Sequence, residues 1–151
     1  VSGFALSKDK GHADTFSYIE HAVPHCTSDE LFKYILRDES RGAFTGRILV
    51  AQDAQKTQAY QNNRNLLLSP SARMQSKPQL EIYADDVKCS HGMTTGQLSE
   101  EALFYMRQRG ISLEEARLML SNAFAEDVLA RIPVEELADT LRSRVEERLR
   151  R

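Results

Sequence analysis

The segment Phe44–Val87, FTGRILVAQDAQKTQAYQNNRNLLLSPSARMQSKPQLEIYADDV, decides the fold of this protein. It contains three short apolar centres, which begin 18 and then 14 positions apart, and polar turn residues follow each centre. Short units repeated in this way bury their faces only against their neighbours. The pattern therefore predicts rungs stacked along one axis, as in a β-helix, with the apolar side chains inside the rungs. These side chains are Ile48 and Val50, Leu66 and Leu68, and Leu80 and Ile82.

A β-sandwich is the alternative for the same segment, but its hairpins favour Asn-Gly or Asp-Gly pairs, and the sequence contains neither. The polar run Gln61, Asn62, Asn63 and Asn65 is compatible with a β-helix in two ways. These side chains either stack as a polar ladder along the coil or form a turn between rungs, since Asn is chiefly a turn residue.

From Phe4 to Val50, a range that overlaps the start of this segment, apolar residues alternate over short stretches. Turn residues such as KDKGHAD and RDESRG separate these stretches. Phe16 and Tyr18 show the alternation. The stretch Leu31–Leu36 is rich in aromatic and β-branched residues, so we expect a strand of four to six residues there.

Downstream of Gly96 the pattern becomes helical. Ser99 is a candidate N-cap for a first helix, and Gly110 is its candidate stop signal. Ser112 and Glu115 form a candidate capping box for a second helix. The apolar face expected for this second helix comprises Leu113, Ala116, Leu120, Ala123, Phe124 and Val128.

A third helix is expected after Pro133, a residue favoured at helix starts. We therefore expect two parts: β-helix rungs over residues 1–97 and a helical domain over residues 98–151. The narrow apolar stripe of the third helix either caps this domain or docks on a partner. The stripe comprises Val134, Leu137, Leu141, Val145 and Leu149.

The composition excludes some classes of function. The chain has 151 residues, of which 41% are hydrophobic and 28% charged, and its net charge is −2. A protein that binds nucleic acid through its phosphates usually carries a clustered basic surplus, so no nucleic-acid partner is expected. No apolar run approaches the length of a membrane span. The two cysteines suggest no disulfide framework, which favours a reducing, cytoplasmic location.

The stretch Ala84–Gly96, ADDVKCSHGMTTG, carries the main candidate site. In an extended segment, Cys89 and His91 point to the same face, and both are metal ligands when deprotonated. The alternative is that Cys89 packs as a small apolar residue and His91 belongs to a turn. Asp85 and Asp86 would point to opposite faces of a strand, so a role in a turn suits them better than shared acid–base chemistry.

A second cluster of metal-binding residue types lies in EHAVPHC, with His21, His25 and Cys26. The spacing of the two histidines suits zinc only if the segment is helical, and Pro24 argues against a helix there. A structural zinc site would require rungs that bring this cluster to Cys89 and His91.

The run Ser40–Gly110, with its motifs YQNNRNLLLS and DDVKCSHG, resembles the SufD branch of the SufB/SufD family of the SUF iron–sulfur cluster assembly machinery. The resemblance extends more loosely over most of the chain. It implies a mainly β protein with a C-terminal α part: a right-handed parallel β-helix followed by a small helical bundle. Because SufD-like proteins carry a long segment before this point, we expect the chain to be a C-terminal fragment.

The resemblance also implies a role and partners. SufD pairs with SufB, and the family builds its transient iron–sulfur cluster at their interface, where the histidine of the KCSHG motif is His91. Cys89 lies in the same motif, and its role is open. One Cys and one His are too few ligands for a cluster, so SufB would supply the others, and we expect no cofactor in the isolated chain.

The family's helical region binds SufC, an ATPase of the ABC type. The match lies in LFYMRQRGIS and includes Phe104, Tyr105, Arg107 and Arg109. Aromatic residues and Arg are enriched at interface hot spots, although the aromatic pair could instead hold its helix against the last rung.

We thus expect a non-catalytic scaffold. The alternative is a polysaccharide-active β-helix enzyme, which clustered acidic residues in an open groove would favour. If the first rung is open, its unpaired strand edge must be covered. We therefore expect either a homodimer or an N-terminal cap over residues 1–20.

Overall fold

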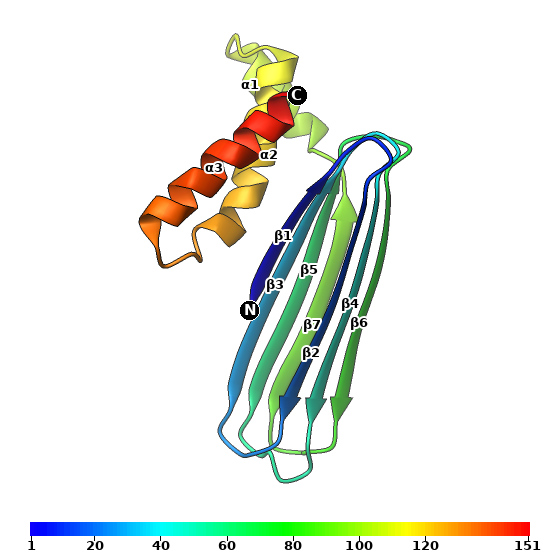
Figure 1. The fold of residues 1–151 in the computed structure, drawn as a ribbon, viewed down its shortest axis with the longest axis vertical. Coiled ribbons are helices and arrows are strands. Elements are labelled where there is room, and N and C mark those ends of the chain that lie inside the picture. Colours follow the sequence, from blue (N-terminus) through cyan, green and yellow to red (C-terminus); the bar gives the residue numbers. More distant parts are fainter.

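The computed structural model describes residues 1–151, in which seven strands build two parallel sheets (Figure 1). One sheet has the order β1-β3-β5-β7 and the other the order β2-β4-β6. The chain passes from one sheet to the other after each strand, so the strands form a β-solenoid and the expected fold class is confirmed. The strands are β1 (Ser2–Ser7), β2 (His12–His21), β3 (Thr27–Leu36), β4 (Arg41–Val50), β5 (Gln58–Leu67), β6 (Arg73–Ile82) and β7 (Lys88–Gly96).

One turn of the solenoid takes two strands, one from each sheet. Ile48 of β4 therefore lies in register with Leu80 of β6. Leu66 of β5 lies in the other sheet, beside Ile35 of β3. The interpretation of the three apolar centres as three successive rungs was thus wrong. They belong to the successive strands β4, β5 and β6, which alternate between the two sheets. A solenoid turn needs one strand in each sheet, because the core lies between the sheets.

The core lies between the two sheets. Ile48 and Val50 are buried in this core, as predicted. Leu66 is also buried, but the prediction that it lines the interior was wrong, because alternation along β5 turns Asn65 inward and leaves Leu66 beside Ile35 on the outer face of the sheet. Leu68 follows the end of β5 and is half-buried. The prediction for Ile82 was wrong, because it is 40% exposed. The physical reason is that β6 is the last strand of its sheet, so no further rung covers it.

A polar ladder also occupies the interior. Gln61, Asn63 and Asn65 are buried and alternate along β5 with residues that face outward. The Nδ2 of Asn65 donates to the Oδ1 of Asn63 at 2.7 Å, and the Nδ2 of Asn63 donates to the carbonyl oxygen of Phe32 at 3.2 Å. The run is therefore a ladder within a strand, and its interpretation as a turn between rungs was wrong.

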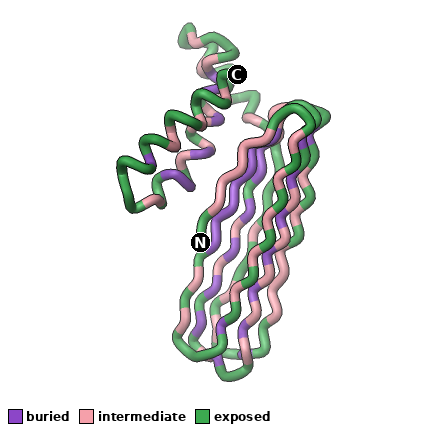
Figure 2. Tube along the Cα trace, viewed as in Figure 1, coloured by how far each residue is buried: buried purple, intermediate pink, exposed green.

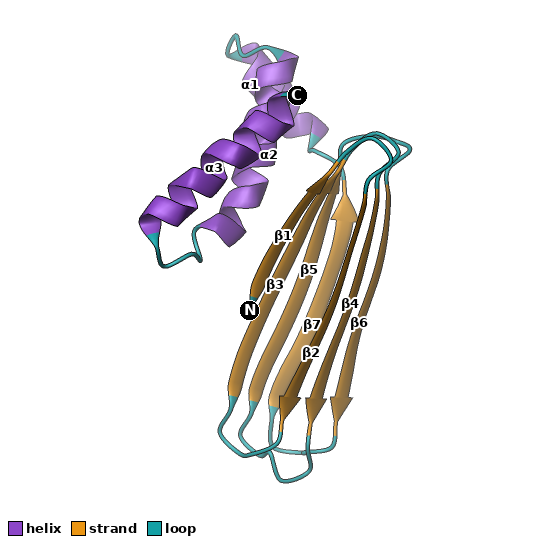
Figure 3. Ribbon diagram, viewed as in Figure 1, coloured by secondary structure: helices purple, strands orange, loops and turns teal.

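Three helices follow the last strand (Figure 3): α1 (Glu100–Gln108), α2 (Leu113–Leu129) and α3 (Glu135–Arg150). Both predicted N-caps are present, but the second half of the expected capping box does not form, because the Glu115 carboxylate pairs with Arg150. The Oγ of Ser99 accepts from the Ala102 backbone N–H, and the Oγ of Ser112 accepts from that of Glu115. Gly110 follows α1 with φ of +84°, a conformation that favours glycine. None of the three helices is both long and apolar enough to cross a membrane.

Helix α2 lies against the outer face of β1 and β3 (Figures 1 and 2). Its coverage explains why Leu31, Lys33 and Ile35, which face away from the solenoid interior, are nevertheless buried. The apolar face expected for α2 was partly wrong, since Leu113 and Ala123 are exposed. The reason is that α2 packs against the sheet and also against α3 and α1, so its buried positions are spread around the helix. They are Ala116, Leu118, Ser121, Ala125, Val128 and Leu129.

Candidate functional site

Strand β7 ends the solenoid and carries the main candidate residues. It pairs only with β5, so its other edge has no partner strand. The backbone N–H and C=O groups along such an edge are available to another chain. The side chains on its inner face are covered only in part, because the opposite sheet ends at β6.

Cys89 and His91 lie on the same face of β7, in register with Ala59 and Gln61 of β5. Cys89 is half-buried and packs against the core cluster that contains Ala59. Burial raises the pKa of the Cys89 thiol, and a hydrogen bond with the Ala59 backbone opposes this shift. His91 is exposed. The site thus presents an accessible imidazole next to a half-buried thiol whose pKa is raised by burial.

This pair does not form a complete metal site. No group of three or more His, Cys, Asp or Glu side chains in the protein is arranged to hold a metal ion. A cluster or metal bound at His91 would therefore need ligands from another molecule.

The structure does not bring the second cluster to this pair. His21 ends β2 and is buried, with its Nε2 2.9 Å from the Oγ of Ser28. His25 lies in the following turn with φ of +61°. Cys26 precedes β3, and β5 lies between β3 and β7. Burial lowers the pKa of His21, which suits a structural histidine that remains neutral.

Asp85 and Asp86 serve the turn before β7. The Nε2 of Gln55 donates to the Oδ1 of Asp85 at 2.9 Å. The Oε1 of Gln55 accepts from the Asp86 backbone N–H, and the Asp86 carboxylate pairs with Lys56. Both carboxylates are therefore engaged with the neighbouring turn.

The predicted partner-binding residues lie on α1 and at its C-cap, Arg109. Phe104 is 64% and Tyr105 58% exposed, so the buried residue that packs this helix is Leu103 instead. The guanidinium of Arg109 lies 4.4 Å from the centroid of the Tyr105 ring and donates to its hydroxyl. Arg107 is also exposed. Helix α1 thus presents aromatic and basic side chains to solvent.

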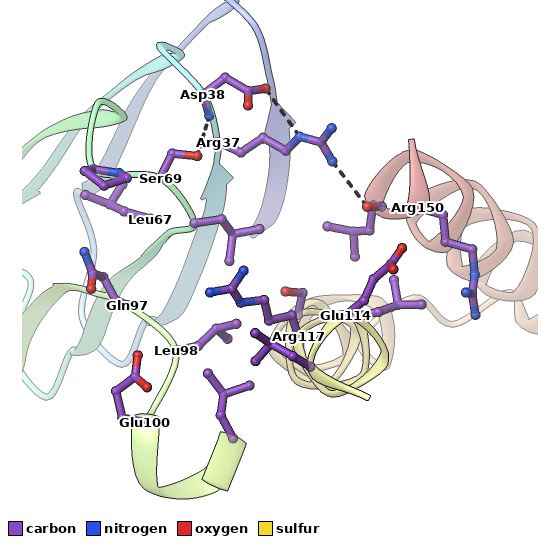
Figure 4. A pocket seen from close by; sticks show the side chains of 17 residues that line it. Arg37, Asp38, Leu67, Ser69, Gln97, Leu98, Glu100, Glu114, Arg117 and Arg150 are labelled. Carbon is purple, nitrogen blue, oxygen red and sulfur yellow. Dashed lines mark hydrogen bonds and ion pairs between the residues drawn. The ribbon is translucent and has the colours of Figure 1, made fainter. Parts of the chain in front are cut away.

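A cleft of about 620 Å³ separates the helices from one end of the solenoid (Figure 4). The side chain of Arg37 reaches across this cleft, and its Nη1 donates to the carbonyl oxygen of Leu149 at 3.2 Å. The cleft lining combines apolar side chains such as Leu98 with charged ones such as Arg117 and Glu114. Sequence reasoning missed this cleft, because its walls come from segments far apart in the chain.

These features define a class: a parallel β-solenoid with an open final strand, a Cys–His pair on that strand and a helical end. The domain described as "SUF system FeS cluster assembly, SufBD core domain" matches residues 1–124, and the chain belongs to this family as a SufD-type member.

Curated relatives agree with this membership. The chain is 41% identical over 149 residues to the iron-sulfur cluster assembly protein SufD of Escherichia coli (strain K12), with 99% of the chain and 35% of the relative covered. It is 45% identical over 130 residues to an iron-sulfur cluster assembly SufBD family protein of Synechocystis, covering 86% of the chain and 29% of the relative. It is 43% identical over 146 residues to the chloroplastic protein ABCI7 of Arabidopsis thaliana, with 96% and 31% covered. The chain thus spans about a third of the length of these relatives.

Proposed function

We propose that this chain acts as a SufD-type scaffold that pairs with SufB and supplies His91 to the site where a transient iron–sulfur cluster is built. The cluster is cargo in this role, and SufB completes its ligand shell. The observation that carries the proposal is the exposed imidazole of His91 on the open final strand, in a chain that belongs to the SufBD core family.

The geometry of β7 supports docking in trans. An unpaired strand edge offers backbone groups to a partner strand, and His91 lies on this strand. The half-buried Cys89 is either a second ligand or a packing residue. Because only the thiolate ligates, its raised pKa means that binding through Cys89 would have to release a proton.

The helical end supports a contact with the SufC ATPase. We place the SufC ATPase on α1, where Phe104, Tyr105, Arg107 and Arg109 are all exposed. Large aromatic side chains and Arg supply much of the binding free energy at protein interfaces. We further propose that residues 1–97 and 98–151 act as separate parts, with SufB bound to the first and SufC to the second.

The scaffold role is non-catalytic, in contrast to a polysaccharide-active enzyme. The engagement of Asp85 and Asp86 within the turn favours the scaffold. Both cysteines are free thiols, which suits a reducing compartment such as the cytoplasm. Without SufB, the open edge of β7 could pair with a second copy, and light scattering of the isolated chain would detect such a homodimer.

The test is His91→Ala in the complex with SufB and SufC, reconstituted anaerobically with iron and sulfide. We expect the complex to form with unchanged stoichiometry and to retain less iron and sulfide than the wild type. His12→Ala, at an exposed histidine on β2, is the matched control and should retain wild-type amounts. Equal retention by His91→Ala and the wild type would show that His91 is not a ligand.

A further inference from the structure

Three interior-facing side chains of one sheet form a column that ends at His91. Glu30 of β3 lies in register with Gln61 of β5, and Gln61 lies in register with His91 of β7. Neighbouring strands of a sheet lie about 4.8 Å apart, so these side chains stack directly on one another. The column runs from a fully buried carboxyl group to an exposed imidazole.

The amide of Gln61 is held in one orientation. Its Nε2 donates to the Oε2 of Glu30 at 2.7 Å, and both residues are fully buried. Gly46 of the opposite sheet makes room for this amide, since a Cβ there would lie 2.4 Å from the Nε2 of Gln61. With its nitrogen turned toward Glu30, the amide has its oxygen free to accept from another partner.

That oxygen is unpaired in the structure. The Oε1 of Gln61 is buried and makes no hydrogen bond. A buried polar atom left unpaired loses its hydration without compensation, so such an atom in a native structure calls for an explanation. The adjacent group in the column is the imidazole of His91, which can donate a ring N–H.

We propose that Gln61, oriented by Glu30, is a positioning residue that accepts a hydrogen bond from the ring of His91. Histidines that bind metals usually donate their second ring N–H to an oxygen, and this bond selects the tautomer and the ring orientation. The bond would leave the other ring nitrogen unprotonated and directed away from Gln61. This inference rests on the proposed function only for its purpose, because this hydrogen bond would form whether or not a cluster is present.

The test reads the tautomer of His91 directly, by ¹⁵N NMR of the ring nitrogens at pH 8.5, where imidazole rings are neutral. We expect the wild type to show two widely separated shifts, as for a single tautomer. In Gln61→Met, which keeps the volume but removes the acceptor, the separation should shrink toward a tautomer average. Equal separations in the two proteins, or an averaged pair in the wild type, would overturn the proposal.

Glu30 provides the matched pair of variants. Glu30→Gln keeps an acceptor for the Nε2 of Gln61 and should preserve the single tautomer. Glu30→Met removes it and should reduce the separation of the two shifts. If Gln61→Met fails to fold, the wild-type spectrum and the contrast between Glu30→Gln and Glu30→Met still decide the question.

The complex with SufB and SufC gives a second readout, because loss of such an orienting partner typically weakens metal affinity about tenfold or more. We expect Gln61→Met to weaken iron retention to this degree. A tautomer change with unaltered retention in both Gln61→Met and His91→Ala would keep the hydrogen bond but overturn the proposed function. Reduced iron retention in His91→Ala, with no tautomer change in Gln61→Met, would support the proposed function but overturn the hydrogen bond.

Discussion

The Nζ of Lys33 on β3 lies 2.6 Å from the Oδ2 of Asp127 on α2, and this ion pair ties the helical end to the solenoid. The Lys33 side chain is only 2% exposed, whereas that of Asp127 is 53% exposed. The Nζ also donates to the carbonyl oxygen of Phe124 and lies 3.9 Å from the centroid of its ring. A buried ammonium group needs such partners, because desolvation penalises its charge.

Asp127→Asn should therefore destabilise the protein by about 1–3 kcal/mol, since Lys33 stays buried but loses its counterion. Urea unfolding followed by circular dichroism measures the change. Asp139→Asn is the control, because Asp139 forms an exposed pair with Arg142 within α3 and should change stability by about 0.5 kcal/mol or less. Similar effects from the two variants would show that the Lys33 pair does not hold α2 in place.

The stability of the protein should depend on pH through His21. Burial lowers the pKa of His21 below the usual value near 6.5. Between the folded and unfolded pKa values the unfolded chain binds more protons, so the free energy of unfolding falls as the pH drops below about 6.5. His21→Gln should flatten this part of the stability curve. His12→Gln, at an exposed histidine, should leave it unchanged, and parallel curves for all three proteins would contradict the prediction.

Cys89 should react slowly with iodoacetamide, because burial raises its pKa and the thiolate is the nucleophile. A Cys26→Ser variant leaves Cys89 as the single thiol. We expect the pH at which the alkylation rate rises to be higher in the folded chain than in urea. Coincident pH profiles, measured by mass spectrometry, would show that the solenoid does not suppress the thiolate.

Gly46→Ala should destabilise the solenoid by about 1–3 kcal/mol through overcrowding. The added Cβ would lie 2.4 Å from the Nε2 of Gln61 and 2.6 Å from the Cζ of Phe44. Thermal unfolding measures this effect. Gly96→Ala is the control, since a Cβ there meets no atom within 4 Å and should change stability by about 0.5 kcal/mol or less. A neutral Gly46→Ala would mean that the interior can shift to accept the methyl group.

The α1 surface should lose SufC affinity in the double variant Phe104→Ala with Arg109→Ala. We expect the dissociation constant to rise about tenfold or more, as at interface hot spots, with no change in circular dichroism. Leu103→Ala provides the contrast. Leu103 is 4% exposed, so this change should cost about 2–5 kcal/mol of folding stability. Unchanged SufC affinity in the double variant would place the contact elsewhere.

Much of the fold was predictable from local sequence patterns. Alternation, β-branched content and turn residues indicated the strands. The strand expected over Leu31–Leu36 exists, but its expected length of four to six residues was wrong, because β3 begins at Thr27 and has ten residues. Ser99 and Ser112 marked the helix starts, because a cap depends on residues only three positions apart. The two-residue spacing of Cys89 and His91 placed both on one face of a strand.

The sequence by itself thus determined the elements, their caps and the pairing of the two candidate ligands, since each depends on contacts within a few residues. Only the tertiary structure decided which strands share a sheet, and with it the burial of Ile48 and the exposure of Ile82. It also placed Gln61 between Glu30 and His91, each about one solenoid turn away along the chain. Alternation predicts which face a side chain occupies, but register between distant strands depends on the length and path of the connecting turns.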